Sequence, residues 1–223
     1  GSRTIRPITL SSEMMYSIKE IYFTLQGEGY YTGRPAVFLR FTGCNLWSGL
    51  EKDRNNAVCN WCDTDFVGRN GPNGGQYNKN QIIDIIKSIW PKEELNTPYV
   101  VCTGGEPLLQ LDEALISIIH SAGFEIGIET NGTILPPKGI DWICVSPKSN
   151  ADFILKRGNE LKIVFPQCGM NPRKHENLDF NYFFIQPMDG PKQQENIKKS
   201  QEFIMKHPQW RLSLQTHKIM GIP

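Results

Sequence analysis

The sequence predicts an α/β protein built on a parallel β-sheet, and three observations support this fold class. Short apolar runs typical of buried strands alternate with stretches in which apolar residues recur at helical spacing. Polar segments repeatedly follow directly after the apolar runs, as at residues 130–132 and 146–148. The chain has 223 residues, 39% of them hydrophobic, which is enough for one domain with a sizeable core. Because ligands of parallel sheets gather at the carboxyl ends of strands, the polar segments indicate where a site would lie.

The expected strands extend along the whole chain. They are residues 17–24, 36–42, 99–102, 124–129, 141–145, 161–165, 182–185 and 211–215. Three helices are expected, at residues 80–90, 112–121 and 193–206. The first carries an apolar face and ends at Pro91, and the second has Gly123 just past its end. Three helices are too few for a complete eight-unit barrel.

The overall composition excludes several classes of protein. A net charge of +1 and a pI near 7.7 give no basic excess, so direct nucleic-acid binding is not indicated. Six cysteines are too few for a disulfide-dense secreted scaffold, and no apolar segment is long enough for a signal peptide or a membrane span. We therefore expect a reducing, cytoplasmic compartment. Residues 1–14, which begin with a Gly-Ser pair typical of a cleaved tag, are expected to lie outside a single domain of residues 15–223.

Three cysteines near the second expected strand resemble a set of metal ligands. Cys59 and Cys62 form a C-x2-C pair, and Cys44 precedes them across a polar span of fourteen residues. A structural zinc site normally has four protein ligands, so a local set of three favours a centre with one open position, such as a 4Fe–4S cluster. Three alternatives stay open on the residues alone: buried thiols, a dithiol redox pair, or a zinc knuckle completed by a histidine. The candidate histidines are His120, His175, His207 and His217.

Three other segments carry candidate binding residues. The sequence Thr103-Gly104-Gly105-Glu106-Pro107 follows an apolar strand, and its glycine pair would let the backbone approach a small ligand closely. Arg40 lies within an apolar strand, where it needs an anion: a bound ligand or, as is common, a buried acid. The segment 25–29 contains two glycines and by itself indicates an ordinary turn.

Together these segments resemble the radical S-adenosylmethionine (SAM) enzymes, in which three cysteines hold the cluster and a Gly-Gly-Glu-Pro strand end contacts SAM. Further segments, at residues 25–29, 40–44, 61–64, 146–148, 186–189 and 215–218, make the chain similar to the 7-carboxy-7-deazaguanine synthase family. The similarity runs from about Ser17 to Pro223. The cysteine spacing is C-x14-C-x2-C, as in one branch of that family, in place of the general C-x3-C-x2-C. The conformation of residues 45–58 is therefore not predictable.

The resemblance implies a fold and an activity. The fold would be an open partial (β/α) barrel of the radical SAM type with several helices missing, in a homodimer. The enzyme would be a carbon–nitrogen lyase that converts 6-carboxy-5,6,7,8-tetrahydropterin to 7-carboxy-7-deazaguanine with loss of ammonia, for queuosine or another 7-deazapurine. A 4Fe–4S cluster, SAM and Mg2+ would be the cofactors, and flavodoxin or ferredoxin the one-electron donor. The reduced cluster would cleave SAM, and the resulting radical would remove hydrogen from C6 of the pterin.

The resemblance also implies roles for individual residues. The cluster ligands would be Cys44, Cys59 and Cys62, and the Mg2+ ligand Thr64, although from the residues alone Thr64 indicates a loop-capping hydroxyl. The SAM contacts would be Trp61, Cys62, Asp63, Gly105, Ser146, Pro147, Lys148, Gln186, Pro187, Met188 and Asp189. The substrate contacts would be Leu25, Gln26, Gly27, Arg40, Thr103 and Pro223, with Glu28, Glu106, Glu129 and His217 as further candidates.

The apolar tail, residues 219–223, is expected to fold back onto the domain. The resemblance implies that the carboxylate of Pro223 closes the substrate pocket, whereas the residues alone indicate a docked hydrophobic tail. Two rival functions remain: a glycyl-radical activating enzyme and a non-enzymatic, zinc-stabilised binding module. Residues 25–27, Arg40 and the tail favour a small anionic substrate over the protein substrate of a glycyl-radical activating enzyme. Metal analysis would distinguish an iron–sulfur enzyme from the zinc-stabilised module.

Overall fold

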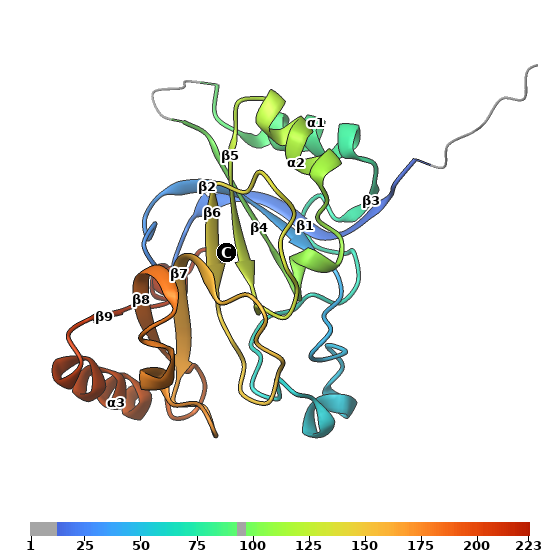
Figure 1. The fold of residues 1–223 in the computed structure, drawn as a ribbon. Helices are drawn as coiled ribbons and strands as arrows, with labels where there is room; N and C mark the ends of the chain where they lie inside the picture. Colours follow the sequence, from blue (N-terminus) through green and yellow to red (C-terminus); the bar gives the residue numbers. More distant parts are fainter. Residues whose placement is uncertain (1–12, 93–96) are drawn as a thin grey trace, which may run out of the picture.

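The computed structural model describes residues 13–92 and 97–223 and shows one nine-stranded, open β-sheet (Figure 1). Residues 1–12 of the expected leader lie outside the described part. The strands are β1 (Tyr16–Leu25), β2 (Pro35–Phe41), β3 (Gly75–Tyr77), β4 (Tyr99–Gly104), β5 (Glu125–Thr130), β6 (Trp142–Val145), β7 (Arg157–Phe165), β8 (Asp179–Pro187) and β9 (Trp210–Leu212). Their order is β3-β1-β2-β4-β5-β6-β7-β8-β9, with β3 and β9 at the two ends.

The prediction of a parallel sheet is confirmed from β2 to β9 and is wrong for the first strand. Each neighbouring pair from β2–β4 to β8–β9 is parallel, but β1 runs antiparallel to both β2 and β3. The physical reason is the short connection between β1 and β2, residues 26–34, which turns the chain back without a crossover helix. The strand β3 was not predicted, because its three residues give no readable pattern.

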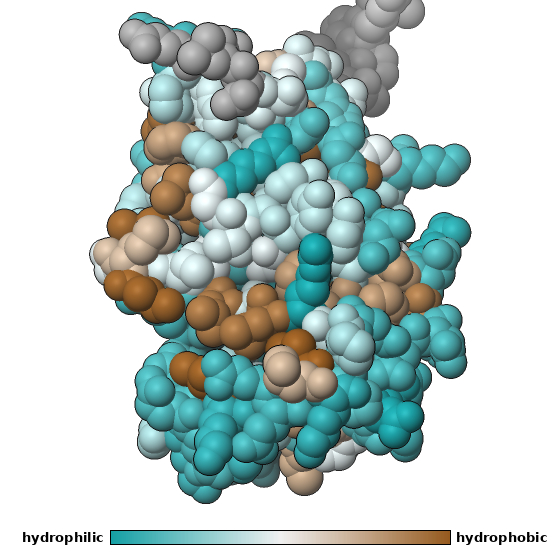
Figure 2. All heavy atoms as spheres, turned by 90° about the vertical axis from the view of Figure 1, so that its left-hand side faces the viewer, coloured by the Kyte–Doolittle hydropathy of each residue, from teal (hydrophilic) through white to brown (hydrophobic). Residues whose placement is uncertain are grey.

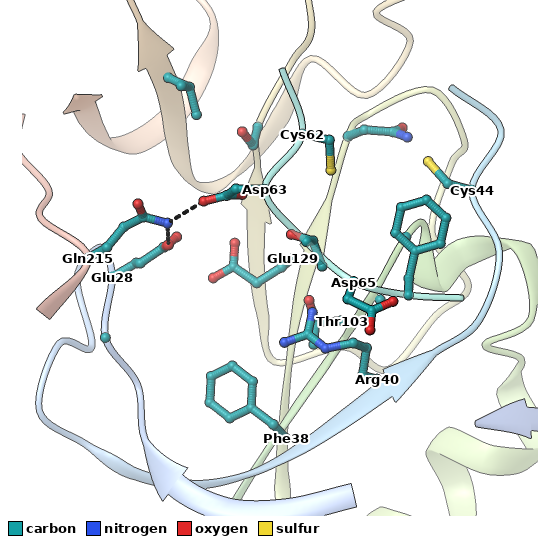
Figure 3. Close-up of a pocket in the computed structure, with 18 of the residues that line it drawn as sticks. Glu28, Phe38, Arg40, Cys44, Cys62, Asp63, Asp65, Thr103, Glu129 and Gln215 are labelled. Atoms are coloured by element: carbon teal, nitrogen blue, oxygen red, sulfur yellow. Dashed lines mark hydrogen bonds between the residues drawn. The ribbon is translucent and has the colours of Figure 1, made fainter. Parts of the chain in front are cut away.

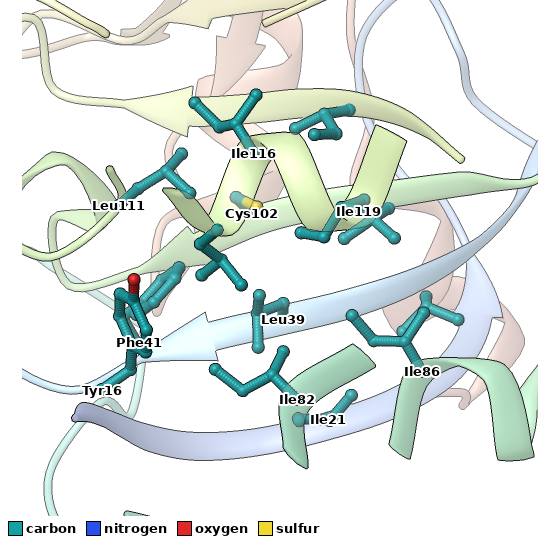
Figure 4. Close-up of a cluster of buried hydrophobic side chains, with 14 of the residues drawn as sticks. Tyr16, Ile21, Leu39, Phe41, Ile82, Ile86, Cys102, Leu111, Ile116 and Ile119 are labelled. Atoms are coloured by element: carbon teal, nitrogen blue, oxygen red, sulfur yellow. The ribbon is translucent and has the colours of Figure 1, made fainter. Parts of the chain in front are cut away.

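The three expected helices are present, and each covers a face of the sheet. The helices α1 (Lys79–Ile89) and α2 (Glu113–Ser121) begin at the capping side chains of Asn78 and Asp112. Their isoleucines pack with β1, β2, β4 and β5 in one hydrophobic core, which includes Ile82 and Ile119 (Figure 4). The helix α3 (Gln193–Lys206) covers β8 and β9 over a second core.

The second half of the sheet has less helical cover. In the described residues no α-helix connects β5 to β6, β6 to β7 or β7 to β8, as expected for a partial barrel. On the face shown in Figure 2, hydrophobic side chains form a band between mostly hydrophilic areas. None of the helices in the described residues has the length and apolar character needed to span a membrane.

The last predicted strand, residues 211–215, is too long, and a short helix follows it. The strand β9 ends at Leu212, and α4 (Thr216–Met220) begins four residues later. Thr216 donates hydrogen bonds from both its backbone nitrogen (3.0 Å) and its hydroxyl (2.9 Å) to the carbonyl of Gly27. Ser213 still donates to Ile185 of β8, and the contact of Thr216 with Gly27 turns the chain away from the sheet after it. Local sequence propensity does not reveal this contact.

Candidate active site

A cavity of about 380 Å³ opens at the carboxyl ends of the parallel strands, where the sequence predicted a site. The strands β2, β4, β5, β7 and β8 contribute Arg40, Thr103, Glu129, Lys162 and Gln186 to its wall. The loop that carries the cysteines closes one end, and the segment after β9 closes another side. Figure 3 shows Cys44 and Cys62 at the upper right of this pocket and Glu28 and Gln215 at the left.

The cysteine loop brings all three predicted cluster ligands to the cavity wall. The backbone nitrogens of Val58 and Cys59 donate to the carbonyl of Leu46, so the two ends of the fourteen-residue span meet. Trp47, 7% exposed, packs edge-on against the ring of Phe66. The sequence gave no indication of this contact, because Trp47 and Phe66 are nineteen residues apart and neither lies in a periodic pattern.

Arg54 fastens the same loop from its surface side. Its guanidinium lies 4.2 Å from the ring centroid of Trp47 and donates to the carbonyls of Asn60 (3.1 Å) and Cys62 (3.0 Å). Because these contacts fix the backbone on both sides of Trp61, they hold the C-x2-C turn in place against the pocket.

The chemistry of the three sulfurs fits a 4Fe–4S cluster. The neighbouring thiol of Cys59 lowers the pKa of Cys62 to about 6, although burial opposes this shift. Burial raises the pKa of Cys44. Within the described residues, no set of three histidine, cysteine or acidic ligand atoms within 4.8 Å of one another includes these cysteines. Three thiols at one end of a cavity are the ligand set of a 4Fe–4S cluster that keeps one iron open to a small ligand.

The Gly-Gly-Glu-Pro segment supports the cysteine loop. A β-carbon on Gly105 would collide with the carbonyl oxygen of Gly43 and would lie 2.7 Å from the β-carbon of Cys44, so only glycine fits here. Glu106 is fully buried and does not line the pocket. Its carboxylate accepts hydrogen bonds from Thr130 and from the backbone nitrogen of Asn131, both at 2.8 Å. Glu106 therefore joins β4 to β5.

Arg40 has a protein acid as its partner, one of the two anions that the sequence left open for it. Its Nε atom lies 2.8 Å from a carboxylate oxygen of Glu20, and its Nη2 atom lies 3.3 Å from the hydroxyl oxygen of Tyr22. The guanidinium also lines the cavity (Figure 3). One edge is thus held by a protein acid, and the group remains available to an anion in the pocket.

A buried lysine for which the sequence predicted no role lies at the end of the pocket opposite the cysteines. Lys162 on β7 is 2% exposed, and its ammonium contacts a carboxylate oxygen of Glu28 at 2.6 Å and of Glu129 at 2.9 Å. Gln26 donates to Glu129 at 3.3 Å and Gln215 donates to Glu28 at 3.0 Å. Burial would raise the pKa of Glu28, but the ammonium of Lys162 and the hydrogen bond from Gln215 lower it to about 2.

The predicted SAM contacts divide into two groups. Six of them besides Cys62 line the pocket: Trp61, Asp63, Gly105, Ser146, Lys148 and Gln186. The ammonium of Lys148 donates to the hydroxyl of Ser146 at 2.7 Å and lies 5.2 Å from the ring centroid of Trp61. Outside the wall are Pro147, Pro187, Met188 and Asp189.

The tail folds back as predicted and reaches the pocket. The C-terminal residues His217 and Pro223 line it. The same wall includes four more predicted ligand contacts, Leu25, Gln26, Gly27 and Thr64. The ring of His217 occupies the space that a β-carbon on Gly27 would need. The ammonium of Lys218 lies 2.5 Å from Asp63 and 2.6 Å from Asp189, so it joins the cysteine loop to the end of β8. The hydroxyl of Thr24 donates to the Pro223 carbonyl at 3.0 Å.

Two similar proteins decide the family. The 7-carboxy-7-deazaguanine synthase of Burkholderia multivorans is 54% identical over 211 residues, and that of Bradyrhizobium diazoefficiens is 55% identical over 210 residues. Each alignment covers 94% of this chain and 100% of the relative. The chain belongs to the 7-carboxy-7-deazaguanine synthase family. No family model matches it.

A solved structure shows that the 7-carboxy-7-deazaguanine synthase family fold is present. The crystal structure of QueE from Escherichia coli has a TM-score of 0.64 and 24% sequence identity, and the match covers 90% of this chain and 93% of that one. The expected open partial barrel is thereby confirmed. As a member of this family the chain is a radical SAM enzyme, and three cysteines line its pocket. The zinc-stabilised module and the glycyl-radical activating enzyme are not supported.

Proposed function

We propose that this chain converts 6-carboxy-5,6,7,8-tetrahydropterin to 7-carboxy-7-deazaguanine with loss of ammonia. The observation that carries the proposal is a single cavity with three cysteine sulfurs at one end and Arg40, Glu28 and Glu129 at the other. A substrate with one carboxylate and several ring N–H donors matches an arginine and a pair of carboxylates. The product would serve queuosine or another 7-deazapurine.

At the cysteine end, Cys44, Cys59 and Cys62 would hold the cluster. A bound 4Fe–4S cluster supplies the electron for reductive cleavage of SAM at its open iron. Trp61, Asp63, Gly105, Ser146, Lys148 and Gln186 line the adjacent wall and would bind SAM. The segments 146–148 and 186–189 also contain four predicted SAM contacts outside the pocket wall: Pro147, Pro187, Met188 and Asp189. These residues would orient Lys148 and Gln186, or would reach SAM through small shifts of their backbone.

At the other end, Arg40 would bind the substrate carboxylate, because a planar guanidinium donates two parallel hydrogen bonds to it. Glu28 and Glu129 would accept hydrogen bonds from the ring nitrogens. Leu25, Gln26, Gly27 and Thr103 line the space between, while His217 and Pro223 would close it on the tail side. Together these contacts would exclude water and hold C6 of the ring in place.

Thr64 would contribute a ligand to Mg2+. It lines the pocket between Asp63 and Asp65, and Mg2+ prefers oxygen ligands and retains several waters. Replacement of Thr64 by alanine should abolish stimulation of turnover by Mg2+ and leave the cluster absorbance unchanged. Titration of activity with MgCl2 measures this, and full stimulation of the Thr64→Ala variant would reject the ligand role.

The enzyme would also need protein partners. A one-electron donor such as flavodoxin or ferredoxin would reduce the cluster. Two copies would form a homodimer, and the exposed hydrophobic band in Figure 2 is the kind of surface that a subunit contact covers. Sedimentation of the reconstituted enzyme would test the second statement.

The decisive test is anaerobic reconstitution with iron and sulfide, followed by incubation with SAM, reductant, MgCl2 and the carboxypterin. Mass spectrometry should detect 7-carboxy-7-deazaguanine. Cys168 provides a matched control, since it is exposed and absent from the pocket wall. Cys168→Ala should keep the product, and Cys62→Ala should lose it. Cleavage of SAM without conversion of the pterin would disprove the proposed substrate.

A further inference from the structure

The most unusual buried charge in the molecule is the ammonium of Lys162. It lies on the pocket side of β7, 2% exposed, and is shared by two carboxylates from distant parts of the chain. Glu28 precedes it by 134 residues in the sequence and Glu129 by 33. A lysine without partners at this depth would lose its charge or destabilise the fold, so the two contacts are what keep it ionised.

The carboxyl groups around Lys162 outnumber it. Besides Glu28 and Glu129, the side chain of Glu160 is buried nearby and accepts a hydrogen bond from the backbone nitrogen of Tyr30 at 2.8 Å. Burial, together with the charge of Glu129, raises the pKa of Glu160. One ammonium therefore lies among three buried acids. Its loss would leave their negative charges to repel one another in a region of low dielectric constant.

Geometry limits what Lys162 can do. Its ammonium occupies one oxygen of Glu28 and one of Glu129, while Gln215 and Gln26 donate to the other oxygen of each carboxylate. These contacts fix the orientation of both acids, which line the pocket in Figure 3. Each carboxylate oxygen can accept a further hydrogen bond, so the pair presents acceptors in a fixed arrangement.

We propose that Lys162 is a positioning residue that holds Glu28 and Glu129 as an oriented pair of acceptors for the N–H groups of the pterin ring. The inference rests on the proposed function, because it assumes a ligand with ring N–H donors. Lys162 itself would act through the two acids, without forming a bond to the reacting atoms. It would therefore govern pterin binding and leave the chemistry of the cysteine end unaffected.

The test compares two ligands on the reconstituted holoenzyme. Lys162→Met keeps the length of the side chain and removes its charge. It should raise the Kd for 6-carboxy-5,6,7,8-tetrahydropterin at least about tenfold, since charged hydrogen bonds to two acceptors are lost. The Kd for SAM and the reductive formation of 5′-deoxyadenosine should stay within twofold of the wild-type values. Lys199→Met is the matched control, because Lys199 pairs with Glu195 on the outside of α3.

A second variant tests the proposal if Lys162→Met does not fold. The double variant Lys162→Met/Glu28→Gln removes one positive and one negative charge, so it leaves fewer unpaired buried charges. It should fold, bind SAM as the wild type does, and still bind the pterin at least about tenfold more weakly. A pterin Kd within twofold of the wild-type value in either folded variant overturns the inference.

The pH dependence gives a readout that a purely structural role would not change. The groups facing Lys162 are Glu28, Glu129, Glu160, Cys144 and, beyond Glu28, His217. Without the ammonium, burial raises the pKa of Glu28, so the acid limb of kcat/KM for the pterin should move to higher pH. An acid limb at the wild-type position in Lys162→Met overturns the inference. If the wild type itself binds no pterin, the proposed function fails, and the inference fails with it.

Discussion

The two ends of the pocket are built in different ways. The cysteine end is a loop that contains one short 3-10 helix, Glu51–Asn56, and is held by Trp47 against Phe66 and by Arg54 across its surface. The carboxylate end consists mainly of side chains on strands of the sheet, with Lys162 on β7 and Glu129 on β5, and Glu28 reaches it from the connection between β1 and β2. The sheet fixes its residues through backbone hydrogen bonds, whereas the loop depends on side-chain contacts.

This difference teaches that the two ends should respond differently to substitution. Ligands at the cysteine end are replaceable only at the cost of the cofactor, because metal binding and loop structure support each other. The carboxylate end has its geometry before any ligand binds, so a substitution there should change affinity without changing cofactor content. The following predictions are ordered from the largest expected effect to the smallest.

The largest effect is expected for Cys59→Ala. Removing one of three ligands should abolish the cluster absorbance and all detectable SAM cleavage, while the fold persists because Cys59 is a small part of the loop core. Iron analysis and circular dichroism of the reconstituted protein measure the two effects. Cys102→Ala removes a buried thiol from the core under α1 and α2 and should keep the iron. An iron content equal to that of the wild type in Cys59→Ala would contradict the ligand assignment.

Arg40→Met tests the carboxylate-binding role on the substrate side. Losing a charged bidentate contact of about 1.5–3 kcal/mol should raise KM for the carboxypterin roughly 10- to 100-fold, with SAM binding unchanged. Because Glu20 would lose its partner, the variant Arg40→Met/Glu20→Gln separates this loss from destabilisation. Arg34→Met, which breaks a pair with Glu125 away from the pocket, should keep KM. An unchanged KM in both Arg40 variants would show that the substrate carboxylate does not bind Arg40.

A smaller effect is expected at Lys218, which joins the cysteine loop to the end of β8 through Asp63 and Asp189. The side chain is about one third exposed, so water weakens its ion pairs, and Lys218→Met should reduce kcat/KM by no more than roughly fivefold. Limited proteolysis should cut the tail faster in this variant. Lys206→Met, at the end of α3, serves as a control. Equal cleavage rates would show that Lys218 does not hold the tail.

The smallest effect concerns stability in acid. The pKa of Glu28 is lowered to about 2 in the folded chain, against an ordinary value of 4.5. Its contribution to stability is therefore present above pH 4.5 and disappears as the pH falls toward 2. Glu28→Gln should lower Tm at pH 7 and flatten the dependence of Tm on pH between 4.5 and 2. Calorimetry measures both, and parallel curves for the two proteins would contradict this.

The sequence predicted most of the fold because its signals are local. The isoleucine pattern and the capping residue Asp112 specified α1 and α2, and α3 has the predicted bounds. The antiparallel β1 and the short α4 escaped prediction because neither depends on a local pattern. The first depends on strand pairing, and the second on the bonds from Thr216 to Gly27.

The candidate site divides in the same way. The spacing of the cysteines predicted one end of the pocket. The charge of Arg40 within an apolar strand showed only that this residue needs an anion, and the family resemblance supplied its expected place at the other end. The same argument applies to Lys162, which interrupts an apolar strand as Arg40 does. However, the partners of such a charge cannot be read from neighbouring residues.

The sequence by itself thus determined the fold class, the family and the residues able to bind a metal or a ligand. Hydrophobic periodicity, capping and motif spacing are readable because they act over a few residues. Only the tertiary structure decided which charges meet. It brought Glu28 and Glu129 to Lys162, and Asp63 and Asp189 to Lys218. It also showed that Glu106 is a buried brace between β4 and β5. Such pairings depend on how strands distant in sequence are ordered in the sheet, and no local interaction specifies that order.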